Sequence, residues 1–142
     1  MRLERRYHRC VARLLATAVA FLVVGCGGDS PAEPATITGT YTLQTINGSP
    51  LPYVNFQNAT DKDEIVSETF TLAAGGQWAH TYRERITTGG TVLLQDGQTA
   101  GTYTGSSAAL SFTSSSNEKF TGSLNGGTLT ILRIGKTLVY TR

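Results

Sequence analysis

The chain has 142 residues, enough for one domain with a single hydrophobic core. It carries 12 basic and 10 acidic side chains, but five of the arginines and one glutamate lie in residues 1–25, so residues 26–142 hold 7 basic and 9 acidic side chains, a net charge of −2. This balance excludes a nucleic-acid-binding protein, which needs a concentrated basic face.

The N-terminal segment has the three-part order of a secretory signal. Five arginines, the last at Arg13, precede an uncharged apolar run over residues 14–24, and the small residue Gly25 follows. The run is too short to cross a bilayer, which takes about 20 helical residues. The alternatives are an ordinary signal peptide cleaved elsewhere and a retained membrane anchor.

The stretch Leu22-Val23-Val24-Gly25-Cys26 resembles the lipobox of bacterial lipoproteins, in which a branched apolar residue and a small residue precede the modified cysteine. The resemblance implies that residues 1–25 are a lipoprotein signal peptide and that a lipidated Cys26 attaches the protein to a membrane. Gly27 stands where an aspartate tends to retain such proteins at the inner membrane. The family's sorting rule therefore implies a cell-envelope protein of the outer membrane, on its periplasmic or surface face, where the cell has one.

Residues 26–35 contain glycine, proline and polar side chains and no large apolar residue, which predicts a flexible tether. The domain then comprises residues 36–142, with 21 threonines and 13 glycines. β-Branched and aromatic residues separated by glycine-containing turns predict an all-β fold. No disulfide is expected in the mature chain, because Cys10 leaves with the signal and Cys26 is modified.

Alternation of apolar and polar residues predicts eight strands joined by short turns, closed into an antiparallel up-and-down barrel. The strands are expected near residues 37–43, 64–73, 77–88, 98–104, 108–113, 119–124, 128–134 and 136–142. A further short run at 91–95 is expected to end in a turn at Asp96-Gly97. Residues 49–63 contain many turn formers and are expected to form a loop folded back over an apolar surface.

The first strand carries Gly39-x-Tyr41, and the last ends at Arg142. Together with the meander and its long first loop, these residues resemble the lipocalin-like, calycin-type domains of small bacterial lipoproteins. In lipocalins a Gly-x-Trp motif places the tryptophan across the closed end of the barrel, beneath an arginine from the last strand. The resemblance therefore implies that Gly39, Tyr41 and Arg142 close one end of the barrel.

Alternation along residues 77–88 places Trp78, His80, Tyr82 and Glu84 on the face toward the interior. The neighbouring strand offers Val66, Glu68, Phe70 and Leu72 on the matching face, with Glu68 near His80 or Tyr82. One interpretation is a ligand cavity lined by Phe70, Leu72, Trp78 and Tyr82, in which His80, Glu68 or Glu84 orients a polar end of the ligand. In the other, Glu68 and Glu84 lie in water at the rim, and His80 is a core histidine bound to a hydroxyl group.

The sequence thus predicts a monomeric, membrane-anchored lipoprotein whose small barrel binds a small apolar or amphipathic molecule. The alternative is a structural or protein-interaction lipoprotein of the envelope, with a filled barrel and no ligand. We do not expect an enzyme, because His80 is the one histidine left after cleavage and no nucleophile motif or phosphate loop accompanies it. No cofactor or metal is expected, since the carboxylates and this histidine lack ligand spacing.

Overall fold

A computed structural model describes residues 36–142, which form ten antiparallel strands in one sheet. The predictions for residues 1–35, namely the signal peptide, the lipidated Cys26 and the tether, lie outside the described residues. The strands are β1 (Gly39–Ile46), β2 (Ser49–Pro50), β3 (Tyr53–Gln57), β4 (Asp61–Ala73), β5 (Gln77–Thr88), β6 (Thr91–Ser106), β7 (Ala109–Ser114), β8 (Lys119–Asn125), β9 (Thr128–Arg133) and β10 (Lys136–Thr141).

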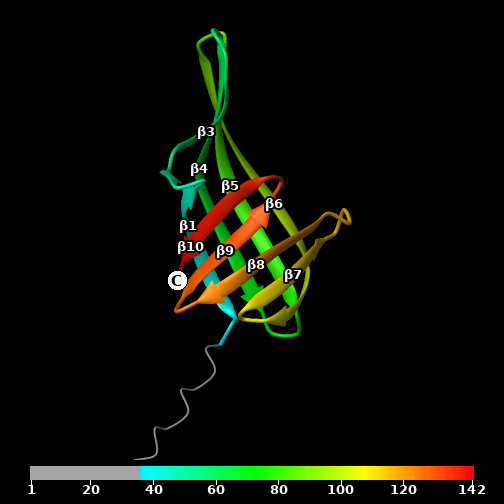
Figure 1. Cartoon of the computed structure of the whole chain (residues 1–142). Coiled ribbons are helices and arrows are strands. Elements are labelled where there is room, and N and C mark those ends of the chain that lie inside the picture. Colours follow the sequence, from blue (N-terminus) through cyan, green and yellow to red (C-terminus); the bar gives the residue numbers. More distant parts are fainter. Residues whose placement is uncertain (1–35) are drawn as a thin grey trace, which may run out of the picture. The chain divides into compact units, whose positions relative to one another are not determined.

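Eight of these strands close into a barrel (Figure 1). Consecutive strands from β4 to β10 pair with one another, and β1 pairs with β10 on one side and with β4 on the other. The β1–β4 register runs from Gly39 opposite Leu72 to Thr42 opposite Thr69. The predicted all-β, eight-stranded antiparallel barrel is therefore confirmed, and it is compatible with a lipocalin-like fold.

Aromatic side chains fill much of the barrel interior. The Phe70 and Trp78 rings stack with centroids 5.1 Å apart, and the Phe112 and Phe120 rings stack at 4.9 Å. Phe70 packs edge-on against Phe112 at 5.4 Å, which joins the two pairs into one cluster. Trp78 also donates its indole N–H to the Thr102 carbonyl at 3.0 Å, so the buried ring has its polar atom satisfied. This part of the barrel is a packed core.

Gly39, Tyr41 and Arg142 meet at one end of the barrel. The Arg142 guanidinium lies over the Tyr41 ring, 5.3 Å from its centroid, and donates to the Thr36 carbonyl at 2.8 Å and the Thr38 carbonyl at 3.1 Å. A Cβ atom on Gly39 would lie 3.2 Å from Arg142 Nη1, and Gly39 has a φ of 150°. The glycine thus leaves room for the arginine, which lies over the Tyr41 ring at this end of the barrel.

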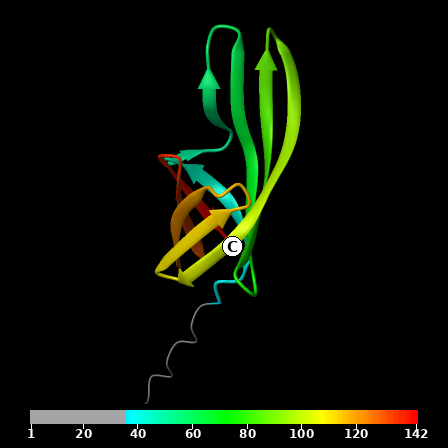
Figure 2. The ribbon, with the colours of Figure 1, turned by 90° about the vertical axis from the view of Figure 1, so that its right-hand side faces the viewer.

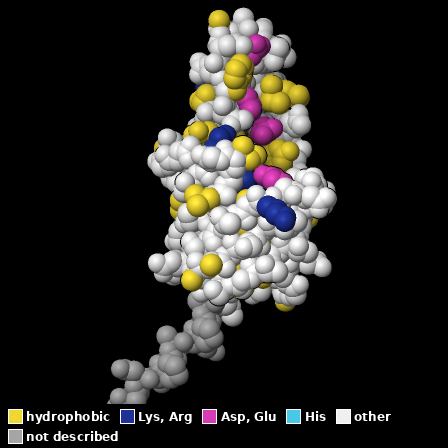
Figure 3. All heavy atoms as spheres, turned by 45° about the vertical axis from the view of Figure 1, so that its right-hand side comes forward, with side chains coloured by type: hydrophobic (Ala, Val, Ile, Leu, Met, Phe, Trp, Pro, Cys, Tyr) yellow, Lys and Arg dark blue, Asp and Glu magenta, His cyan; other side chains and the backbone are white. Residues whose placement is uncertain are grey.

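Strands β4, β5 and β6 continue beyond the barrel at its opposite end (Figure 2). Residues 61–66, 83–88 and 91–97 of these strands, with β3 paired to β4, form a four-stranded projection that we call the extension. Gly89 and Gly90 join β5 to β6 with φ angles of 54° and 84°, the paired positive values of a type I′ hairpin turn. Figure 3 shows apolar and acidic side chains close together along one face of this upper part.

The predicted turn at Asp96-Gly97 is wrong, because β6 runs through both residues. Asp96 pairs with Arg83 on the adjacent strand, with N–O distances of 2.7 and 2.9 Å. Gly97 faces Tyr82, and a Cβ atom built on it would lie 2.1 Å from Tyr82 Cζ. The glycine is needed here for the close approach of an aromatic ring.

The prediction of a loop over residues 49–63 is also wrong in part. This segment contains β2, which pairs with β1, and β3, which pairs with β4. Leu51 and Tyr53 pack against the core as predicted, whereas Phe56 is 54% exposed.

A register shift between Ile65 and Ser67 changes the expected face of β4. Below the shift Glu68, Phe70 and Leu72 keep the predicted inward face. Above it Ile65 is buried opposite Glu84, in place of Val66. An extra residue in one strand reverses the alternation beyond it.

We predict that Phe70→Ala lowers the free energy of unfolding by about 3–5 kcal/mol, because it removes the ring that links the two stacked pairs. Phe56→Ala is the matched control, and we expect a change within about 0.5 kcal/mol at this exposed position. Urea denaturation followed by Trp78 fluorescence measures both. Equal losses for the two variants would contradict a packed aromatic core.

Candidate functional site

The structure divides the predicted cavity residues into two groups. Phe70, Leu72 and Trp78 are buried in the aromatic core. The other four line a cavity of about 410 Å³ at the end of the barrel that carries the extension, here called the mouth cavity; they are Glu68, His80, Tyr82 and Glu84. Ile65 and Leu138 supply apolar lining. The mouth cavity, which lies above the core, is therefore lined by both polar and apolar side chains.

A hydrogen-bonded network forms the floor of the mouth cavity. Glu68 Oε2 lies 3.1 Å from His80 Nε2 and accepts from the Tyr140 hydroxyl at 2.8 Å. His80 Nδ1 lies 3.3 Å from the Thr99 hydroxyl. Burial and the nearby Glu68 carboxylate raise the pKa of Tyr140, so its hydroxyl remains a hydrogen-bond donor. Both ring nitrogens of the histidine are thus engaged by side chains of the chain itself.

Tyr82 covers this network from above. Its ring stacks on the His80 ring with centroids 5.4 Å apart and at an angle of 28°. Gly97 on β6 leaves the space that the ring occupies. Tyr82 is half-buried and lines the cavity.

Two basic side chains, Arg133 and Lys136, line the rim of the mouth cavity, and both contact other side chains of the chain. Lys136 lies 5.3 Å from the Tyr53 ring centroid and donates to the Asn55 side chain. Arg133 forms a bidentate pair with Glu118 at 2.9 and 2.6 Å, and this pair lowers the pKa of Glu118. These contacts tie the β9–β10 turn to β3 and to β8.

Glu84 has a different environment from Glu68. Within residues 36–142 no cation lies in ion-pair contact with Glu84 or with Asp63, its diagonal neighbour on β4. Burial first, and then the charges of Asp63 and Glu68, raise the pKa of Glu84. The Asp63 Oδ2 atom accepts from Asn55 at 3.0 Å, while its buried Oδ1 atom has no hydrogen-bond partner among the described residues. Glu84 lines the mouth cavity, and its carboxylate has no cationic partner among the described residues.

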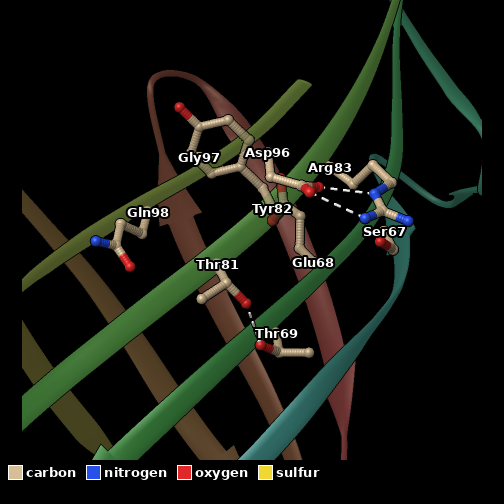
Figure 4. Close-up of a pocket in the computed structure, with 9 residues that line it drawn as sticks. All are labelled: Ser67, Glu68, Thr69, Thr81, Tyr82, Arg83, Asp96, Gly97 and Gln98. Atoms are coloured by element: carbon tan, nitrogen blue, oxygen red, sulfur yellow. Dashed lines mark hydrogen bonds and ion pairs between the residues drawn. The ribbon is translucent and has the colours of Figure 1, made fainter. Parts of the chain in front are cut away.

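A second hollow, of about 560 Å³, lies where β4, β5 and β6 leave the barrel (Figure 4). Four of its polar side chains form two pairs: Thr69 and Thr81 share a hydrogen bond of 2.7 Å, and Arg83 binds Asp96. The residues that line this hollow include no aliphatic side chain, whereas Ile65 and Leu138 line the mouth cavity.

Comparison of the chain with protein-family models, with curated proteins and with solved structures finds no match. The site must therefore be interpreted from its own geometry. Among the described residues, no helix has the length and apolar character needed to cross a membrane. Within the same residues, no group of three or more His, Cys, Asp or Glu side chains could hold a metal ion.

Several residues that line the mouth cavity or contact its carboxylates were not identified from the sequence. Tyr140 and Leu138 alternate along the last strand, and this pattern could have placed both inside the barrel. Asp63 was expected in a loop, although it lies in β4. The sequence pattern could not place Thr99 at the cavity, because threonine occupies both faces of many strands in this chain.

We predict that Glu84→Gln raises the free energy of unfolding at a pH of about 7. The folded-state pKa of Glu84 lies above its ordinary value of 4.5, so the folded protein holds this proton more tightly than the unfolded chain. Ionisation therefore destabilises the fold as the pH rises, and the advantage of glutamine should shrink as the pH falls to about 4.

Glu118→Gln is the control of opposite sign. The Glu118 pKa is lowered by Arg133, so its carboxylate contributes stability above the ordinary value of 4.5 that is lost as the pH falls. Urea denaturation of both variants over this pH range measures the two effects. A Glu84→Gln protein less stable than the original near neutral pH would contradict the assigned environment.

Proposed function

We propose that this protein binds a small amphipathic molecule at the mouth of its barrel and that its role is binding and not catalysis. The observation that carries the proposal is a half-buried Glu84, without a cationic partner in the described part of the chain, beside the apolar lining of the mouth cavity. Ligand pockets typically combine an apolar lining with a few polar groups and start at about 300 Å³. A volume of about 410 Å³ lies in that range.

The polar end of the ligand would contact Glu84. Glu68 uses its Oε2 atom for both His80 and Tyr140, whereas Glu84 accepts no side-chain hydrogen bond within residues 36–142 and is the more open of the two carboxylates. A ligand group that donates hydrogen bonds or carries positive charge would offset the burial of this carboxylate. An amine head group fits this requirement better than a carboxylate.

The apolar end of the ligand would contact Ile65 and Leu138 and continue along the extension. By register, Ile86 lies opposite Leu93, and both occupy the face of the extension that carries Glu84. This face continues the inner surface of the barrel, so an elongated ligand could extend from the cavity along Ile86 and Leu93.

A catalytic role has less support. His80 is buried and uses one ring nitrogen with Glu68 and the other with Thr99. A general base must come within hydrogen-bond reach of the substrate proton, and Tyr82 stacks on this ring.

The packed aromatic core favours the second candidate function, a structural or protein-interaction lipoprotein. Phe70, Leu72 and Trp78 fill the space that a deep ligand would need. A ligand inside the barrel would therefore have to bind above these side chains, in the mouth cavity.

Membrane attachment through a lipidated Cys26 is part of the proposal. Its support is the order of arginines, apolar run, Gly25 and Cys26 in the sequence. An envelope location, at the outer membrane where the cell has one, rests on the same segment. Two or more acyl chains would hold the protein firmly on a membrane.

For the ligand, we predict that dodecylamine binds about tenfold more tightly than dodecanoate, the difference expected for one hydrogen-bonded charged contact. Glu84→Gln should remove most of this preference. Native mass spectrometry of the full chain carrying Cys26→Ser, which needs no detergent, measures both affinities. Asp96→Asn is the matched control, because it makes the same charge change away from the mouth cavity. If neither molecule binds, or if Asp96→Asn has the same effect, the mouth site is refuted.

For the anchor, we predict that Cys26→Ser stops fatty-acid labelling and releases the protein from membranes. Radiolabelled palmitate and membrane fractionation measure the two effects, with Cys10→Ser as the control that retains both. Continued labelling of the Cys26→Ser protein would refute lipidation at this residue.

A further inference from the structure

Strand β6 has a long backbone edge that no other described strand covers. Its whole upper part pairs with β5, from Thr91 to Thr102, whereas β7 pairs only with residues 101–106. The Ala100 carbonyl accepts from the Ser115 N–H at 2.9 Å, which marks the last contact on the β7 side. Residues 91–99 therefore form an open edge, within residues 36–142, which we call the β6 edge.

The direction of the backbone groups along this edge follows from two hydrogen bonds. Tyr103 donates its N–H to Gly76 on the β5 side, whereas Ala100 accepts on the β7 side. Backbone groups of successive residues alternate in direction, and the β5–β6 register has no shift. The N–H and C=O groups that point away from β5 therefore belong to Val92, Leu94, Asp96 and Gln98.

Proteins usually protect such an edge with lysine, proline or a bulge. Residues 91–99 contain no lysine or proline, and Val92, Leu93 and Leu94 are 59%, 57% and 58% exposed. The other edge of the extension is different: β3 has a register shift between Val54 and Phe56 and a contact from Lys136 to Asn55. Only one edge of the extension is thus suited to accept a further strand.

We propose that two copies of this chain associate by antiparallel pairing of their β6 edges around Leu94, so that the two extensions join into one sheet. A two-fold axis through this position places the same segment on both sides of the interface, as in most protein dimers. This proposal departs from the monomer expected from the sequence. It uses a different surface from the mouth cavity and does not depend on a ligand.

The sequence of the edge is compatible with pairing to itself. With Leu94 opposite Leu94 of the partner subunit, Val92 lies opposite Asp96 of the partner subunit, and no two like charges face each other. Asp96 is already neutralised by the bidentate contact from Arg83 on its own chain. Opposed apolar side chains and paired backbone groups both stabilise a sheet.

The contact should be reversible. One strand pair buries less than the roughly 1,600 Å² of a standard protein interface. Confinement of a lipid-anchored protein to one membrane would favour such a weak contact by raising the local concentration.

Cysteine cross-linking of the full chain in its own membranes tests the proposal. Directly opposite residues that exchange hydrogen bonds have Cα atoms about 5.5 Å apart, which suits a disulfide. Leu94→Cys should therefore give a disulfide-linked dimer on mild oxidation. Leu132→Cys is the matched control: Leu132 is 54% exposed but lies in β9, between β8 and β10, and both variants share the same native cysteines.

A second substitution checks that the cross-link reports strand pairing. Val92→Lys in the Leu94→Cys chain should reduce the dimer at least several-fold, because a lysine on an edge opposes strand addition. Equal cross-linking of Leu94→Cys and Leu132→Cys would overturn the proposal. So would a Leu94→Cys product whose mass shows a different protein, since the edge would then accept a strand of another partner.

Discussion

The packing of Phe70 against its neighbours is the interaction on which the rest of the structure depends. This ring from β4 contacts rings from β5, β7, β8 and β10, so one side chain connects most of the barrel wall. The cluster that it centres closes off the interior below the mouth. A filled core stabilises a small domain without disulfides, but within the barrel it leaves space for a ligand only at the upper end.

The two carboxylates above this core, Glu68 and Glu84, differ in whether other side chains of the chain bind them. Glu68 receives the Tyr140 hydroxyl and faces His80, so it contributes to a satisfied network. Glu84, two residues beyond Tyr82 on β5, lacks such partners among the described residues, and its charged form is destabilised by burial and by nearby negative charge. Groups that reduce stability in this way are often retained for binding.

Much of the barrel could be predicted from local sequence, because alternation has a period of two and glycines mark most turns. The inward face of residues 77–88 is an example. The errors came from contacts between distant residues: Asp96-Gly97 has the composition of a turn, but its conformation is fixed by Arg83 and Tyr82 on another strand. The depth of each inward residue could not be predicted either, since the division between Trp78 in the core and Glu84 at the mouth depends on barrel closure.

The β5–β6 hairpin restricts how this protein can change length during evolution. Its type I′ turn requires a hydrogen-bonded pair on either side of Gly89-Gly90, and such pairs recur at every second position. Adding one residue to each strand would place the wrong kind of pair next to the turn and reverse the faces beyond the insertion. Related chains should therefore differ in the length of this hairpin by multiples of four residues, two in each strand.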